Sequence, residues 1–173
     1  MRKPRQQPEY PELLRCTILL DTSVPPDNRK NLLARCRILH VTDDDAQHCL
    51  LTNILQPDNS FSIERIRTGI QALKVLNSRP TDLLPNLVIV PWMLPLLTSR
   101  EFTREMKSDE RLRAIPLIVI SASLPSEEVL ALYNAGVSCV VATGTEYDPL
   151  CLALRALKNL WVDCAILPYS RWP

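Results

Sequence analysis

The stretch PNLVIVPWMLP, residues 85–95, decides the fold of this chain. Four consecutive apolar residues, Leu87 to Val90, follow a Pro-Asn turn signal, and three of them are β-branched. Such a run is typical of a short strand that is buried on both faces, as in a parallel sheet. In open parallel sheets the reacting groups lie just beyond the carboxyl ends of the strands, and here that place falls on Pro91. Proline has no charge, no nucleophile and no backbone N–H, so the sequence predicts a strand end that cannot react.

Strands and helices are expected to alternate along the chain. The strands are expected at residues 38–41, 61–66, 87–90, 115–120 and 139–142. Each helix has a signal at its start, namely an aspartate within 43–45, Thr68-Gly69, the capping box Thr98-Ser99-Arg100-Glu101, Pro125, and Asp148-Pro149 with proline in the first helical position. The fourth helix is expected to end at Gly136 in a left-handed cap. This order predicts an α/β fold, a doubly wound five-stranded parallel sheet with helices on both faces.

One globular domain with an extension at each end is expected from length and composition. The chain has 173 residues, of which 46% are hydrophobic and 23% are charged. Prolines break any long element over residues 1–34, which we interpret as a loosely ordered extension, while the apolar patch 13–21 leaves an added edge strand open. Residues 35–162 are the expected domain, and 163–173 are the end of the last helix and a tail.

Charge and hydropathy exclude several kinds of partner. The net charge is +1, which indicates no broad attraction to nucleic acid or to an anionic membrane. No apolar run approaches the roughly 20 residues of a membrane-spanning helix, and the polar start lacks the apolar core of a signal peptide. No glycine-rich phosphate-binding motif appears, so no nucleotide cofactor is expected. The six cysteines are scattered singly, which predicts reduced thiols in a cytoplasmic protein.

Five segments carry a resemblance to a known family. They are ILHVTDDD, RTGIQAL, PNLVIVPWMLP, IPLIVISAS and NAGVSCVVATG, in this order and at suitable spacings. The chain from about residue 36 to 162 resembles the receiver domain of two-component response regulators. The terminal LKNLWVDCAILP looks like the last helix of stand-alone regulators partnered with bacterial phytochromes. The resemblance implies a flavodoxin-like receiver fold with strand order 2-1-3-4-5 and a role in phosphorelay signalling.

The resemblance also implies where a phosphorylation site would lie. The pair of acidic residues that hold Mg²⁺ in such receivers falls on Thr42 and Asp43, with Asp44 as a further carboxylate. The aspartate that accepts the phosphoryl group falls on Pro91. We therefore expect no metal cofactor, with Asp43 as a weak candidate for a cation, and the alternative reading of 43–45 is helix capping.

The other positions of the receiver site are only partly kept. The hydroxyl at the end of the fourth strand is present as Ser121, which is also explained as a serine that satisfies backbone groups. The lysine that pairs with the phosphoryl group is replaced by Thr143, and the aromatic switch residue by Val140. Thr98-Ser99 takes the place of the Asp-Gly that usually opens the third helix.

Two functions follow from this degenerate site. The preferred one is a non-catalytic pseudo-receiver that binds protein partners, such as a sensor histidine kinase or another regulator, without phosphorylation. The alternative is a regulator phosphorylated at a non-standard residue, Asp43, Asp44 or Ser121. Direct binding to nucleic acid is not expected.

The last helix has more apolar residues than one buried face requires. From 150 to 167 only a thin polar stripe remains, so a second cover is expected, either the N-terminal extension or another chain. We expect a two-fold homodimer through this helix and the tail. The interface residues predicted are Leu154, Leu157, Trp161, Ile166 and Trp172.

Overall fold

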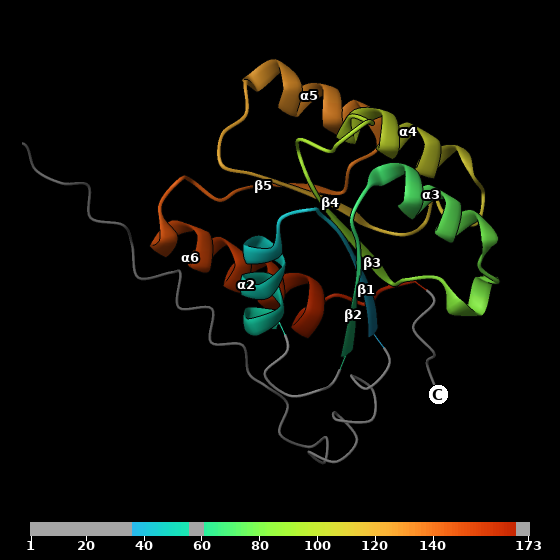
Figure 1. Cartoon of the computed structure of the whole chain (residues 1–173), viewed down its shortest axis with the longest axis horizontal. Helices are drawn as coiled ribbons and strands as arrows, with labels where there is room; N and C mark the ends of the chain where they lie inside the picture. The colour runs from blue at the N-terminus through green and yellow to red at the C-terminus, as the bar shows by residue number, and fades with distance from the viewer. Residues whose placement is uncertain (1–35, 56–60, 169–173) are drawn as a thin grey trace, which may run out of the picture.

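The computed structural model describes residues 36–55 and 61–168 (Figure 1). The predicted N-terminal extension, its optional edge strand and the tail residue Trp172 lie outside these described residues. The described residues include no helix that is long and apolar enough to cross a membrane.

Five parallel strands form one sheet in the order β2-β1-β3-β4-β5, which confirms the predicted fold. The strands are β1 Cys36–Val41, β2 Phe61–Ile66, β3 Leu87–Pro91, β4 Leu117–Ser121 and β5 Cys139–Ala142. β1 begins two residues before the predicted start because Cys36 and Arg37 pair with β2. β4 begins two residues later than predicted, since Pro116 has no N–H and the Ile115 N–H bonds back to Leu112 O at 3.0 Å.

Helices cover both faces of the sheet (Figure 1). They are α2 Asp45–Leu55, α3 Gly69–Ser78, α4 Ser99–Ser108, α5 Ser126–Ala135, α6 Tyr147–Leu157 and the π-helix η3 Lys158–Cys164, with a short 3-10 turn, η2 Thr81–Leu83. One core holds α3, α4 and α5 against the sheet around Phe102, Met106 and Leu132. The other core packs α2 and α6 against the opposite face through Leu51, Leu55 and Leu154. Each strand of the sheet's centre is therefore buried on both sides, as the apolar run of β3 predicted.

Most of the predicted helix starts and ends are confirmed, and two of them are wrong. The Thr98 capping box is present, and Gly136 caps α5 with a φ of 103°. α6 begins at Tyr147, so Pro149 is the third helical residue rather than the first; it is tolerated there because its N–H would lack an intrahelical partner anyway. The helix ends at Cys164 instead of reaching Leu167, because the Ala165 N–H bonds to Leu160 O in a π turn and Ala165 is extended.

Asn86 fixes the amino-terminal edge of the sheet. Its side chain is fully buried, and its Oδ1 accepts a hydrogen bond from the Arg37 N–H at 2.7 Å. Its Nδ2 donates to Pro168 O at 2.8 Å, beyond the last helix. Asn86, which directly precedes β3, thus links the start of β1 to the chain that follows η3.

Candidate functional site

The predicted site residues meet at one edge of the sheet. Asp43 follows β1, Pro91 ends β3, Ser121 ends β4 and Thr143 follows β5. Because the strands are parallel and β1, β3, β4 and β5 are consecutive neighbours, their carboxyl ends lie side by side. This edge, with the loops that leave it, is called the carboxyl edge below.

Pro91 closes the strand end where a reacting group is expected. Its carbonyl oxygen accepts a hydrogen bond from Ser99 Oγ at 2.8 Å, and the same hydroxyl contacts Trp92 O. Ser99 is buried and is the first residue of α4, so it ties the loop after β3 back onto the strand. The sequence placed Ser99 in the capping box and noted it as a departure from the receiver pattern, but it did not predict these bonds. Its position shows that it now anchors this loop.

The aspartates after β1 are engaged in local structure. Asp44 is the residue before α2, and its Oδ1 accepts the Gln47 N–H at 3.0 Å, which is the bond of a helix cap. Thr42 Oγ1 accepts the Asp44 N–H at 3.2 Å and donates to Gln47 Oε1 at 3.1 Å. Asp43 is exposed. The capping interpretation of the acidic run therefore applies to Asp44.

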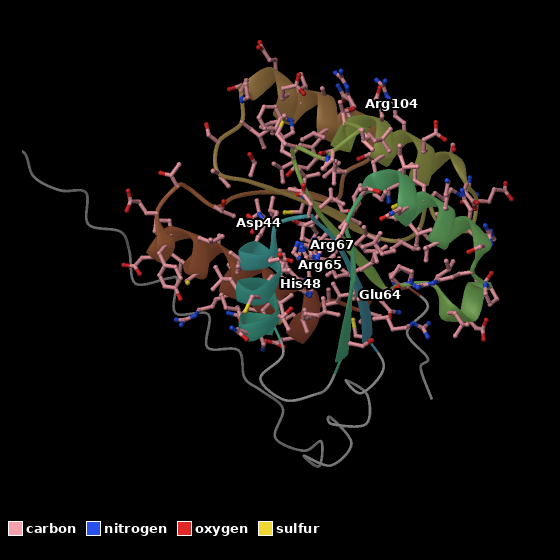
Figure 2. The ribbon with its side chains drawn as sticks, viewed as in Figure 1. Asp44, His48, Glu64, Arg65, Arg67 and Arg104 are labelled. Atoms are coloured by element: carbon pink, nitrogen blue, oxygen red, sulfur yellow. The ribbon has the colours of Figure 1, made fainter. Side chains whose placement is uncertain are left out.

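Arg65 contributes a positive charge to this region that sequence reasoning missed. It lies opposite His40 in the β1–β2 pairing, and its Nε donates to Thr42 O at 3.0 Å. Its guanidinium also pairs with Asp45, which Arg67 reaches at 3.4 Å. Arg65 and Arg67 are labelled in Figure 2. The hydrogen bond from Arg65 lowers the pKa of the Asp45 carboxyl. The position of Arg65 could have been predicted from the alternation along 61–66, which places it on the same sheet face as Ile63.

These donors do not fit a Mg²⁺ site of the kind that the resemblance implies. Mg²⁺ prefers octahedral oxygen ligands that include carboxylates. β3 supplies none, Asp44 caps α2, and Asp45 is paired with arginines. Within residues 36–55 and 61–168, no group of three or more His, Cys, Asp or Glu is arranged to hold a metal ion.

The buried His40 of β1 and the partly exposed His48 of α2 contact each other between the sheet and the helix. Their Nδ1 atoms are 3.1 Å apart and their rings stack with centroids 5.3 Å apart. His40 is fully buried. Burial lowers the pKa of His40 to about 3, with the charges of His48 and Arg65 acting in the same direction and Asp44 opposing them. Two N–H groups cannot point at each other, so at neutral pH one Nδ1 donates and the other accepts.

The hydroxyls at the ends of β4 and β5 are satisfied locally. Ser121 Oγ donates to Ser123 O at 2.8 Å, and the buried Thr143 donates to Gly144 O at 3.3 Å. The Val140 N–H donates to Tyr133 Oη at 3.2 Å, and its side chain packs against the core of α3, α4 and α5. Neither strand end supplies the cation that would offset a phosphoryl group.

Comparison with known proteins gives relatives but no matching family model. Response regulator Rcp1 of Synechocystis sp. is 25% identical over 135 residues, which are 76% of this chain and 92% of Rcp1. The chemotaxis protein CheY of Pseudomonas aeruginosa is 26% identical over 102 residues, 59% of this chain and 79% of CheY. The Mn²⁺-bound structure of Rcp1 superposes with a TM-score of 0.71 at 25% identity, covering 77% of this chain and 99% of Rcp1.

A second solved structure agrees with this result. It is the phosphorylated cyanobacterial phytochrome response regulator RcpA, with a TM-score of 0.72 at 25% identity over 78% of this chain and 99% of RcpA. In sequence and in fold, the chain is similar to response-regulator receiver domains. The predicted resemblance and strand order are thus confirmed, and the receiver domain places the protein in two-component signalling.

Proposed function

We propose that this receiver domain is not phosphorylated at the usual strand end and works as a phosphorylation-independent protein-interaction module. The observation that carries the proposal is Pro91 at the end of β3. Formation of an acyl phosphate needs a carboxylate nucleophile, which proline lacks. Thr143 at the end of β5 supplies no positive charge, and Arg65 pairs with Asp45 at the other side of the edge. The phosphorylated state of RcpA and the Mn²⁺-bound state of Rcp1 therefore do not transfer to this chain.

The partners that fit this proposal are proteins of the same signalling system. A sensor histidine kinase or another regulator would bind the receiver surface, and the domain would have no catalytic activity of its own. We also propose a cytoplasmic location. Support comes from the cysteines at 36, 49, 139, 151 and 164, which are all free thiols in the described residues.

Treatment with acetyl phosphate and Mg²⁺ is expected to leave the intact mass of the protein unchanged. The physical reason is the missing carboxylate at position 91, and RcpA treated in parallel is the positive control. A hydroxylamine-labile gain of one phosphate would contradict the proposal. Fragmentation would then show whether Asp43, Asp44 or Ser121 accepts it, which is the alternative function.

We further propose that the protein forms a two-fold dimer through α6 and η3, with different anchors from those predicted. Leu154 and Leu157 are 0% and 3% exposed because they pack into the core shared with α2, so they cannot be interface residues. Trp161 is half-buried against the same core. The exposed apolar residues on this side are Tyr147, Leu152, Leu160 and Ile166, and Trp172 lies outside the described residues. Ile166 is thus the one predicted anchor that is fully available among those described.

Replacement of Leu160 by Asp is expected to convert the dimer into a monomer. Leu160 is 56% exposed, so the change should cost little folding stability while placing a charge in an apolar contact. Light scattering at micromolar concentration measures the mass, and Ile70→Asp on α3, on the opposite face, is the matched control. A wild-type protein that runs as a monomer would refute the dimer.

A further inference from the structure

We propose that the carboxyl edge is the docking surface for a basic, amphipathic segment of a partner protein. This inference rests on the proposed function, because an edge that still received phosphoryl groups would need to stay open to a phosphodonor. The argument starts from the loop after β3 and continues with the charges around it.

Two large apolar side chains stand out from the loop that follows Pro91. Met93 is 72% exposed and Leu96 is 82% exposed. Leu96 also has a φ of 67°, in the left-handed region that leucine rarely adopts. A strained backbone that presents an apolar side chain to water has no stabilising role within the described part of the chain. Such residues persist where function requires the conformation.

The loop is held so that these two side chains point outward. Two other leucines of the loop, Leu94 and Leu97, pack into the core that contains Phe102. Together with Phe102 they lie next to Gly69 at the start of α3. Ser99 fixes the start of the loop through the carbonyls of Pro91 and Trp92. Met93 and Leu96 are therefore presented on an anchored loop, which lowers the entropic cost of binding a partner.

Carboxylates surround this apolar centre. Asp43 and Asp44 are exposed at the end of β1, which is adjacent to β3 in the sheet. On the other side, Glu127 is exposed in the first turn of α5, and Glu146 and Asp148 are exposed where α6 begins. Several of these carboxylates stabilise the helix N-termini at which they lie. A partner is nevertheless attracted by their total negative charge.

The basic residues of the edge do not cancel this charge. Arg65 and Arg67 share the single carboxylate of Asp45, so one positive charge remains there, and Arg100 adds a second at the start of α4. The five carboxylates named above outnumber these two charges. The position where receivers of this kind carry lysine is the neutral Thr143. A surface with this pattern repels nucleic acid and anionic membranes. It complements a protein segment with apolar side chains on one face and Lys or Arg beside them.

The test uses the full chain and a synthetic probe, a fluorescein-labelled 18-residue helical peptide with Leu on one face and Lys on the other. Fluorescence anisotropy should give a micromolar Kd that weakens roughly tenfold between low and high salt. A matched peptide with every Lys replaced by Glu should bind at least about tenfold more weakly. Chemical-shift changes in the full chain should centre on residues 92–98 and 122–125.

Variants locate the binding site. Met93→Asn with Leu96→Asn should weaken binding about tenfold, and asparagine accepts the left-handed conformation, so the fold is kept. Asp43→Asn with Glu146→Gln should weaken it about threefold and reduce its salt dependence. Leu83→Asn, at an exposed apolar residue of η2 near the amino-terminal ends of the strands, is the control that should bind normally. Unchanged thermal unfolding in each variant verifies folding.

Three results would overturn the proposal. The first is equal binding of the basic and acidic peptides. The second is a loss of binding with Leu83→Asn but not with the Met93 and Leu96 changes. The third is an effect of the Met93 and Leu96 changes on the signals of residues 1–35, which would make the occupant a segment of this chain. The acetyl phosphate experiment is independent of all three, so failure of the docking surface and failure of the proposed function are distinguishable.

Discussion

At pH 4 the protein is expected to be about 3 kcal/mol less stable toward unfolding than at pH 7.5, mainly because of His40. The pKa of His40 is about 3 in the folded protein against an ordinary value of 6.5. Between these values the unfolded chain binds a proton that the folded protein does not. The stability that depends on neutral His40 is therefore fully present above pH 6.5, and it is lost progressively as the pH falls from there toward 3.

The surroundings of His40 explain why it stays neutral. Its side chain is fully buried, and its Nε2 has no hydrogen-bond partner within the described residues. His48 faces its other ring nitrogen, and the guanidinium of Arg65 lies on the same side of the sheet. Asp44 is the carboxylate that favours protonation, and its effect is the smallest of these contributions. A proton on His40 would thus be a buried charge without a counter-ion, which is costly.

His40→Val is the variant that tests this prediction. Valine suits a buried strand, so the variant should fold, and its stability should change much less between pH 7.5 and pH 4. Urea unfolding at several pH values measures the free energy directly. His48→Gln is the matched control, since it removes the partner but keeps the buried imidazole, and its stability should still fall steeply with acid. Parallel curves for wild type and His40→Val would show that another group controls the acid sensitivity.

The fold could be predicted because its signals are local. The apolar run of β3, the capping box at Thr98 and the left-handed Gly136 each act within a few residues, and the structure has all three. The missed boundaries depend on pairing rather than on composition. Cys36 is a strand residue because Phe61 lies opposite it, and the last helix ends at Cys164 because the Ala165 N–H bonds to Leu160 O.

The candidate site could be predicted only in part, for the same reason. Strand ends are visible in the sequence, so the shared edge of Pro91, Ser121 and Thr143 followed from strand order. The pairing of Arg65 with Asp45 joins residues 20 positions apart, and the His40–His48 contact crosses from a strand to a helix. Such contacts depend on how α2 sits on the sheet. The burial of Leu154 and Leu157 was missed because an apolar stripe does not show which of its residues face the protein's own core.

Restoring an aspartate at position 91 alone is expected to give little or no phosphorylation. The new carboxylate would share the edge with Asp43 and Asp44, and like charges without a cation would raise its pKa. The Arg65 guanidinium cannot serve as that cation, because it is already bonded to Thr42 O and paired with Asp45. Pro91→Asp therefore supplies a nucleophile without the charges that stabilise the phosphoryl group as it is transferred.

The triple variant Thr42→Asp, Pro91→Asp, Thr143→Lys is expected to accept phosphate from acetyl phosphate in the presence of Mg²⁺. Aspartate at 42 can still accept the Asp44 N–H that Thr42 Oγ1 accepts now, and it adds a carboxylate for the cation. Lysine at 143 restores a positive charge at the end of β5. Intact mass should show a hydroxylamine-labile gain of one phosphate that EDTA prevents. The same variant with Asn at 91 is the matched control and should gain nothing, since an amide is not a nucleophile here. Efficient labelling of Pro91→Asp alone would show that the loss of one carboxylate, rather than of the whole charge arrangement, silenced this receiver.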